Sequence, residues 1–320
     1  MIMCMEKYVY QMFILGLENV EEPLNKGLGG VIFFTKDINS DEQLKSDIKK
    51  IKQAAIIPPF ISIDQEGGRV ERTENIRPKR LSAKYACEKG ILKSQSEEIA
   101  KELSEWGFNL NFSPCIDVNT NPNNPIIGER AFSDNPDEVI KGMDIVINAM
   151  RENGIIPCVK HFPGHGDADK DSHLTLPVID STLDEMETVH IKPFKYAVKN
   201  NIEMIMAAHI YCSCFGKEII PASLSTNALN YLRNTLGYEG IIISDDMVMK
   251  GVQTYGSLEA CITGINAGLN MFIFRNSDEQ TINMINNLCK VVENDKNLRE
   301  KVMSSYTKIT KLKALYGIID

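Results

Sequence analysis

The sequence predicts an α/β fold, and in particular a single TIM-type (β/α)8 barrel that spans residues 1–320. Three observations lead to this prediction. Short apolar segments alternate with longer amphipathic segments along the whole chain, and most of the apolar segments end in polar residues. The length of 320 residues also suits one barrel, since such barrels take roughly 250 residues plus insertions.

Seven apolar segments have the composition of parallel strands that are buried on both faces. In chain order they are residues 30–34, 59–64, 108–112, 155–160, 202–209, 240–245 and 269–274. Between them, Ser40, Asn135 and Thr182 each stand where a helix can begin with a side-chain cap. The last segment, about 295–320, has the pattern of a closing amphipathic helix. The chain is therefore a series of βα units.

The polar residues at the strand ends favour a barrel over an open doubly wound sheet. They are Asp64, Asp117, Lys160, His161, His209 and Asp245. In a barrel the carboxyl ends of all strands meet at one site, whereas in an open sheet only the strands beside the switch point contribute. No strand is followed by the glycine-rich phosphate-binding pattern of a dinucleotide or P-loop fold.

Composition excludes several classes of function. The net charge is −8, with 43 acidic and 35 basic residues, and Lys and Arg form no cluster, so nucleic acid is not expected as a partner. No apolar run approaches the ~20 residues that span a bilayer, and the first residues lack the pattern of a secretion signal, so we expect a cytoplasmic protein. The eight cysteines are expected to be free thiols, and Cys212 and Cys214 to pack rather than to hold a metal.

The segment from Lys160 to His173 holds three of the five histidines of the chain together with three aspartates. Pro163, Gly164 and Gly166 indicate sharp turns. Loops of this kind after barrel strands carry functional groups. The segment is therefore the main candidate for the chemistry of the protein.

Two metal interpretations of this segment differ in strength. Asp167, Asp169 and Asp171 have the spacing of a calcium loop, but Ser172 and Val178 stand where an EF-hand loop needs glycine and glutamate, so we reject that interpretation. A metal hydrolase could instead use histidines and aspartates as ligands. Its candidate ligands are His161, His165, His173 and the neighbouring aspartates.

Acid/base catalysis by a histidine is the third interpretation. Asp171 and His173 are two residues apart and can meet on a curved loop. A carboxylate partner fixes the imidazole tautomer and stabilises the protonated ring near neutral pH.

The whole segment, followed by Leu176 and Pro177, resembles the signature of the β-N-acetylglucosaminidase branch of glycoside hydrolase family three. Other segments resemble the same family in the same order along nearly the whole chain. They are residues 29–34, 63–72, 112–118, 128–132, 207–209 and 240–247. The family fold is a barrel, in agreement with the strand-end argument.

The resemblance implies a role for each matching residue. Asp245 corresponds to the nucleophile, with Asp246 as its competitor, and His173, paired with Asp171, corresponds to the acid/base. The implied substrate-binding residues are Asp64, Arg72, Arg130, Lys160 and His161. For Asp64 and Arg130, a structural ion pair at the mouth of the barrel is also possible.

The resemblance further implies a retaining glycosidase that needs neither a metal nor a cofactor. Its expected substrates are β-linked N-acetylglucosaminyl saccharides, and fragments of peptidoglycan (muropeptides) in particular. Many relatives carry a second domain after the barrel, which supplies the acid in many β-glucosidases; here we expect the acid to lie within the barrel chain. Three different functions stay open: a metal hydrolase, a carbohydrate-binding barrel without turnover, and a phosphorylase.

Four more residues have expected structural roles. His165 is expected to shape its loop, and His209 to support the catalytic residues from behind. Trp106, the only tryptophan, is expected in the core at the end of a helix, and His190 at the surface of a helical segment.

Overall fold

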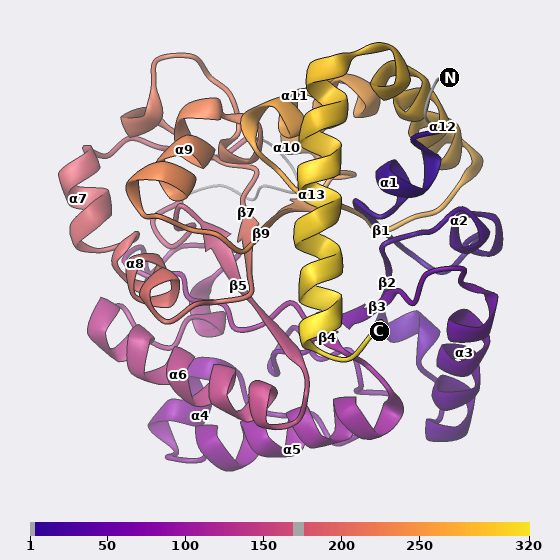
Figure 1. The fold of residues 1–320 in the computed structure, drawn as a ribbon. Coiled ribbons are helices and arrows are strands. Elements are labelled where there is room, and N and C mark those ends of the chain that lie inside the picture. Colours follow the sequence, from indigo (N-terminus) through magenta and orange to yellow (C-terminus); the bar gives the residue numbers. More distant parts are fainter. Residues whose placement is uncertain (1–3, 169–175) are drawn as a thin grey trace.

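The computed structural model describes residues 4–168 and 176–320. Eight parallel strands close into a barrel in the order β1-β2-β3-β4-β5-β7-β9-β10, with β10 pairing back to β1 (Figure 1). The strands are β1 (Phe13–Leu15), β2 (Gly30–Phe33), β3 (Phe60–Ile63), β4 (Leu110–Asn111), β5 (Ile156–Phe162), β7 (Met204–Ala207), β9 (Ile241–Asp246) and β10 (Met271–Phe274). The predicted barrel is confirmed, and all seven predicted segments contain a strand.

Strand β1 was not predicted, and it is only three residues long. This strand closes the barrel, because it pairs with β2 on one side and with β10 on the other. The rings of Phe13 and Phe272 stack across the β1–β10 seam with their centroids 5.5 Å apart.

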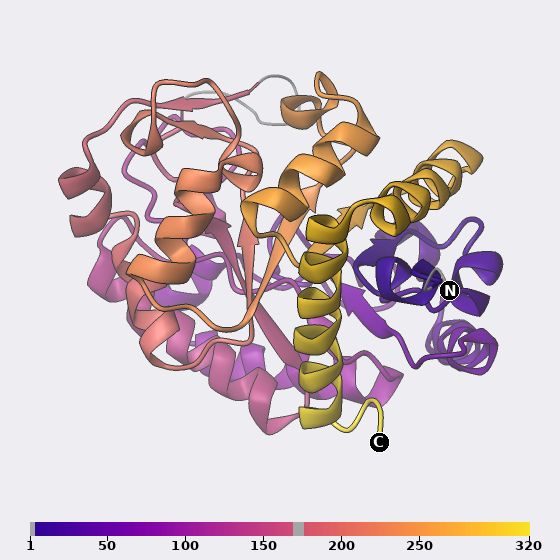
Figure 2. The same ribbon diagram turned by 45° about the horizontal axis from the view of Figure 1, so that its top comes forward.

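Helices surround the barrel on the outside (Figures 1 and 2). They are α1 (Glu6–Tyr10), α2 (Glu21–Asn25), α3 (Asp41–Ala54), α4 (Ala83–Glu88), α5 (Leu92–Trp106), α6 (Pro136–Glu152), α7 (Leu183–Thr188), α8 (Lys192–Lys199), α9 (Thr226–Asn230), α10 (Lys250–Gln253), α11 (Ser257–Ala267), α12 (Glu279–Asn294) and α13 (Lys296–Leu315). The predicted closing helix is α13, which packs against α1, α11 and α12. Within the described ranges, no helix combines the length and apolar character that crossing a bilayer requires.

The predicted helix starts are present, each with a side-chain cap. The Asn135 side chain accepts a hydrogen bond from the backbone N–H of Asp137 at the start of α6. Thr182 and Glu185 form a reciprocal capping box at the start of α7. Ser40 caps α3, but the Gln43 side chain accepts from the N–H of Asn39 rather than of Ser40.

A second, two-stranded sheet lies outside the barrel. Its strands β6 (Val178–Ile179) and β8 (Tyr211–Cys212) are parallel, and Ile179 lies opposite Cys212. This sheet joins the stretch that follows residue 175 to the stretch that follows β7.

A buried lysine from the last helix packs against the base of β3. Lys313 of α13 is fully buried, its Nζ donates to the Oε1 of Gln11 at 2.9 Å, and it lies 4.9 Å from the centroid of the Phe60 ring. Burial lowers the pKa of Lys313 to about 7. Both contacts are neutral groups, so the charged form of the amine is poorly compensated.

Candidate active site

The predicted site residues meet in one cavity of about 200 Å³ at the carboxyl ends of the strands. Six of them line it: Asp64, Arg72, Arg130, Lys160, His161 and Asp245. Apolar side chains from the neighbouring strand ends, among them Phe34 and Met206, complete the wall. The other two predicted residues, Asp171 and His173, lie outside the described residues.

These side chains reach the cavity because the apolar residues of each strand are buried and polar residues follow where the strand ends. Asp64 follows β3 directly, and Asp245 lies one residue before the end of β9. After Asp64 the backbone reverses at Gly67, with φ of 99°. A Cβ atom at Gly67 would lie 2.4 Å from the carbonyl oxygen of Leu81, so only glycine fits there. The turn brings Arg72 back to the cavity, where its guanidinium lies 5.6 Å from the ring centroid of Phe34.

Lys160 connects two carboxylates inside the cavity. Its Nζ lies 2.6 Å from Asp64 Oδ1 and 2.6 Å from Glu66 Oε1. Burial opposes the charged amine, but Asp64 and Glu66 outweigh this effect and hold the pKa of Lys160 above its ordinary value. Lys160 is therefore a fixed cation at the base of the cavity.

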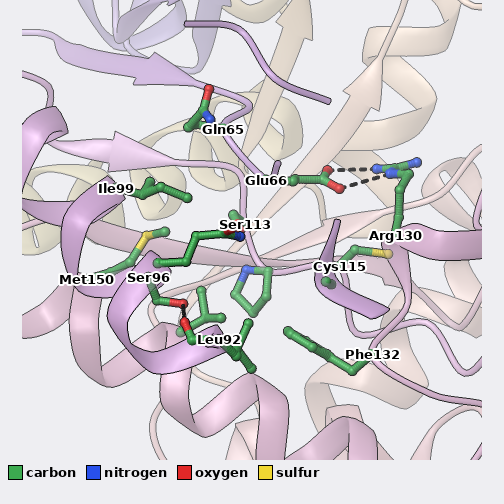
Figure 3. Close-up of a pocket in the computed structure, with 14 residues that line it drawn as sticks. Gln65, Glu66, Leu92, Ser96, Ile99, Ser113, Cys115, Arg130, Phe132 and Met150 are labelled. Carbon is green, nitrogen blue, oxygen red and sulfur yellow. Dashed lines mark hydrogen bonds and ion pairs between the residues drawn. The ribbon is translucent and has the colours of Figure 1, made fainter. Parts of the chain in front are cut away.

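Arg130 forms a two-pronged ion pair with Glu66. Nε donates to Oε2 at 2.9 Å and Nη2 donates to Oε1 at 2.8 Å (Figure 3). Asp64 and Arg130 do not pair with each other, but each forms an ion pair, Arg130 with Glu66 and Asp64 with Lys160. Burial opposes ionisation of Glu66, but Arg130 and Lys160 outweigh it and hold the pKa of Glu66 well below its ordinary value.

Glu66 therefore positions both cations, a role that sequence reasoning missed. Its place in the Asp64–Arg72 segment was the one sequence signal, and Glu71 shares that segment. Behind the ion pair lies a small cavity of about 20 Å³, walled by Cys115, Phe132 and other apolar groups (Figure 3). A cavity of this volume can hold one water molecule, because one water needs a cavity of at least about 10–15 Å³.

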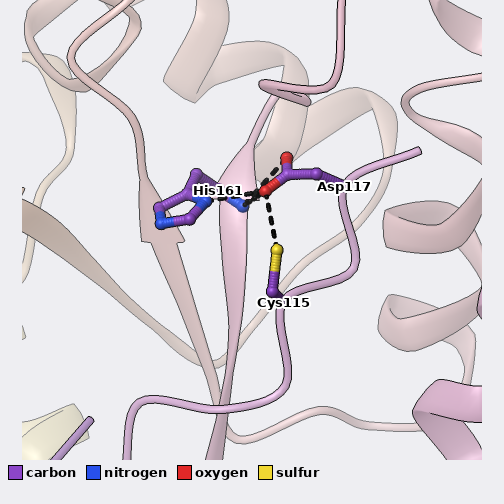
Figure 4. Close-up of side chains that lie close together, drawn as sticks. All are labelled: Cys115, Asp117 and His161. Carbon is purple, nitrogen blue, oxygen red and sulfur yellow. Dashed lines mark hydrogen bonds and ion pairs between the residues drawn. The ribbon is translucent and has the colours of Figure 1, made fainter. Parts of the chain in front are cut away.

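Asp117 holds His161 in a similar way (Figure 4). Its Oδ2 lies 2.7 Å from His161 Nδ1, and its carboxylate also accepts the backbone N–H groups of His161 at 3.2 Å and His165 at 2.6 Å. Burial opposes ionisation of Asp117, but the two histidines outweigh it and hold its pKa well below the ordinary value. An ionised Asp117 places the hydrogen of His161 on Nδ1 and orients the ring.

Asp117 and His161 also form, together with Cys115, the one group in the described part of the chain whose donor atoms are close enough to share a metal ion. Donor atoms of Cys115, Asp117 and His161 all lie within 4.8 Å of one another. The Cys115 thiol donates to Asp117 Oδ2 at 3.2 Å, so the three groups already bond to each other (Figure 4).

Burial lowers the pKa of His165 to about 4, with a further contribution from His161, and the ring is neutral at neutral pH.

Asp245 and Asp246 have different surroundings. Both carboxylates line the cavity, and the Oδ1 of Asp245 accepts the N–H of Asp246 at 2.7 Å. Burial opposes its ionisation, but His161, His209 and the Asp246 N–H outweigh this effect and hold the pKa of Asp245 below its ordinary value. Asp245 is therefore a carboxylate at neutral pH, as a nucleophile must be.

Both oxygens of Asp246 are occupied by the adjoining backbone and one arginine. Oδ2 pairs with Arg275 Nε at 2.7 Å, and Oδ1 accepts the N–H groups of Val248 at 3.1 Å and Arg275 at 3.2 Å. Burial raises the pKa of Asp246. These contacts give Asp246 a structural role in the turn after β9.

Three of the four residues with expected structural roles lie as predicted. His165 bonds through its backbone to Asp117, and His209 lies between Ser223 Oγ at 2.7 Å and the Asp246 carbonyl at 3.2 Å, as expected of supporting residues. Trp106 ends α5 and is buried. The prediction that His190 is exposed is wrong, since it is buried between α7 and α8 against Gly164.

Comparison with known proteins decides the family. The sequence model of the glycosyl hydrolase family 3 N terminal domain matches residues 5–312. The chain belongs to glycosyl hydrolase family 3. The predicted family is thus confirmed.

Several relatives of this family-3 chain have names that state an activity. The chain is 33% identical over 317 residues to beta-hexosaminidase A of Pseudoalteromonas piscicida, covering 89% of this chain and 53% of that one. It is 33% identical over 272 residues to beta-hexosaminidase of Psychromonas ingrahamii, covering 82% of this chain and 79% of that one. The solved family-3 beta-N-acetylglucosaminidase from Paenibacillus sp. superposes with a TM-score of 0.91 at 26% identity, covering 99% of this chain and 63% of that one. The chain thus spans about half of the first relative and less than two thirds of the solved structure.

Proposed function

We propose that the chain is a retaining exo-β-N-acetylglucosaminidase that removes terminal N-acetylglucosamine from β-linked substrates. The observation that carries this proposal is the place of Asp245 in a cavity walled by Lys160, Arg72 and His161. A cavity of about 200 Å³ is small beside the roughly 300–1,000 Å³ of drug-sized ligand sites. It suits one terminal sugar ring, and the hexosaminidase names of the relatives support N-acetylhexosamine as that sugar.

In the proposed mechanism Asp245 attacks the anomeric carbon while the bond to the leaving oxygen breaks. His173, with Asp171 as its expected partner, gives its proton to that oxygen. In the second half, His173 takes a proton from water, the water oxygen bonds to the anomeric carbon, and the bond to Asp245 breaks. Two displacements at the same carbon retain its configuration.

The remaining cavity residues would bind the sugar. Asp64 can accept hydrogen bonds from sugar hydroxyls, while Lys160, Arg72 and His161 can donate to them. Arg130 also lines the cavity and would bind the sugar, with its guanidinium held in place by the ion pair with Glu66. We propose fragments of peptidoglycan (muropeptides) as the natural substrates, acted on in the cytoplasm by residues 1–320 as one barrel unit. Cell fractionation and turnover of purified fragments test both parts.

Trapping the intermediate is the decisive experiment. A 2-acetamido-2-deoxy-5-fluoro glycosyl fluoride should label Asp245, and Asp245→Ala should abolish hydrolysis of an aryl N-acetyl-β-glucosaminide. His173→Ala should keep turnover of substrates whose leaving groups need no acid. A label on Asp246, or no label with an active enzyme, would overturn the assignment.

A metal hydrolase is the second candidate function, and the group of Cys115, Asp117 and His161 favours it. It predicts that EDTA abolishes hydrolysis and that added metal restores it, whereas the glycosidase mechanism predicts unchanged rates in EDTA. The same assays also test a phosphorylase, which turns over faster with phosphate, and a barrel that only binds carbohydrate, which shows affinity without turnover.

A further inference from the structure

Two cysteines outside the cavity lie side by side. Cys212 ends β8, and Cys214 lies in the short turn Ser213–Phe215 that follows. Their Sγ atoms are 3.1 Å apart, with Cys212 buried and Cys214 partly exposed. Among the described residues, which include all eight cysteines, this is the one pair of cysteines whose sulfurs share a hydrogen bond.

The shared hydrogen bond makes this pair more acidic than an isolated buried thiol. Donation from Cys214 lowers the pKa of Cys212, while holding the proton raises the pKa of Cys214. By contrast, burial alone raises the pKa of Cys261. The proton can pass between the sulfurs, so the partly exposed Cys214 can also carry the negative charge. Because the thiolate is the reactive form, this pair is more reactive than a buried thiol without a sulfur partner, such as Cys261.

We propose that Cys212 and Cys214 form a reversible disulfide when the protein meets a peroxide. The thiolate attacks one peroxide oxygen, and the O–O bond breaks. This leaves a sulfenic acid on the attacking sulfur. The departing oxygen takes up the proton that the attacking thiol lost on ionisation and becomes water or an alcohol. The second thiol attacks the sulfenic sulfur, forms the S–S bond and releases water. Two thiols lose two electrons, and the peroxide gains them.

Oxidation changes the local geometry, because a disulfide holds its sulfurs about 2.05 Å apart. The two Sγ atoms must approach each other by about 1 Å from their present 3.1 Å. The turn between them carries Ser213, whose Oγ donates to Asp180 Oδ1 at 2.7 Å directly after β6. Ile179 of β6 also pairs with Cys212 itself. Closing the disulfide therefore pulls on β6.

The turn also packs against a residue that is next to the candidate active site in sequence. The ring of Phe215 lies 6.4 Å from that of Phe162, the residue after His161 in β5. The stretch of chain that contains β8 and this turn begins at His209, whose Nε2 contacts the carbonyl oxygen of Asp246 at 3.2 Å. In sequence, β6 begins five residues after His173. If the proposed function holds, the disulfide lowers hydrolysis, since a displacement of about 1 Å can reduce an enzyme rate by up to about 100-fold.

The experiment treats the full-length protein with hydrogen peroxide and measures two quantities. Thiol titration after denaturation, with intact mass, reports the chemistry; turnover of an aryl N-acetyl-β-glucosaminide reports the effect. We expect the loss of two thiols and two hydrogen atoms, mapped to Cys212 and Cys214, and a fall in kcat/KM of about tenfold. Dithiothreitol should reverse both changes.

Two variants complete the test. Cys214→Ser should keep its turnover under peroxide, whereas Cys87→Ser, which removes a half-buried thiol with no sulfur partner among the described residues, should lose turnover as the parent does. Uptake of oxygen atoms without a disulfide would overturn the proposed modification. A disulfide with unchanged kcat/KM would overturn its effect on the site. If even the reduced protein fails to hydrolyse the sugar, the proposed function is wrong, and the thiol count alone still tests the disulfide.

Discussion

Replacing Glu66 with glutamine tests whether one buried carboxylate holds two sugar-binding cations in place. Glu66 makes three short contacts, to Arg130 Nε at 2.9 Å, to Arg130 Nη2 at 2.8 Å and to Lys160 Nζ at 2.6 Å. Glutamine has one acceptor oxygen, so in either orientation its NH₂ group faces a donor. Both cations should therefore lose their fixed position.

The magnitude follows from the number of contacts. The contact that the NH₂ group faces is lost, which costs about 1.5–3 kcal/mol, and the contacts that the amide oxygen keeps are weaker because that oxygen carries no net charge. The free energy of unfolding should fall by about 3 kcal/mol. With an unfolding entropy of roughly 2.1 cal/mol/K per residue over 320 residues, the Tm should fall by about 4–5 °C. Two displaced cations should lower kcat/KM by about 10–100-fold, because each 1.4 kcal/mol is a factor of ten.

A matched control lies at the other end of the barrel. Glu203 also accepts two hydrogen bonds from one arginine, Arg151, both at 2.9 Å, and one from Tyr316 at 2.6 Å. Glu203→Gln should lower the Tm and leave kcat/KM unchanged, as measured by calorimetry and by hydrolysis of the aryl glycoside. If Glu66→Gln lowers the Tm but keeps kcat/KM within about twofold of the parent, the reasoning about Glu66 is refuted.

Three further predictions concern other buried charged residues. Asp245→Asn should lower kcat by about a thousandfold or more, because it removes the proposed nucleophile, whereas Asp246→Asn should mainly lower the Tm and keep kcat within about tenfold; equal losses of kcat would contradict the assignment. Asp117→Asn removes the anion that orients His161, so kcat/KM for the aryl glycoside should fall about 10–100-fold, and an unchanged value would show that the orientation is unimportant. Lys313 has a pKa lowered to about 7 from 10.5, so the unfolded chain binds more protons between these values and stability should rise with pH from about 7 to about 10.5. Lys313→Met should abolish this rise in denaturant titrations at pH 7 and pH 10, and a rise that persists would assign it to other groups.

The sequence was sufficient for those site residues that stand at a strand end. Asp64, Lys160 and Asp245 could be predicted because a buried apolar strand that ends in a polar residue indicates the open end of a barrel, and the family resemblance added Arg72 and Arg130. Their common cavity agrees with that prediction. Their roles in binding and catalysis remain predictions.

The role of Glu66 in positioning two cations could not be predicted, because its partners are remote in sequence. Glu66 meets Arg130 only after the turn at Gly67 and the fold bring the two together. Nothing in the local sequence separates Glu66 from Glu71, which instead bonds to Arg80 and Thr73 in a structural network. Burial and bonding partners, rather than residue type, distinguish the two.

The sequence did not predict those parts of the fold in which an element is short. Strand β1 has three residues, too few for a periodic pattern, and only its pairing with β2 and β10 defines it. His190 was misplaced for a related reason, because α7 ends at Thr188 and the turn after it is covered by a tertiary contact with Gly164.

The β1–β10 seam has a consequence for the folding of the chain as it is synthesised. The seam joins Phe13 to Phe272, so the barrel closes only after β10 has emerged from the ribosome. Until then, the apolar strands present two unpaired edges, the kind of surface that pairs with other chains. A contact between residues so far apart in sequence also forms slowly, because loop closure precedes any gain from it. Because β1 is made first and its partner β10 last, the barrel architecture itself keeps the nascent protein exposed to aggregation until most of the chain has been synthesised.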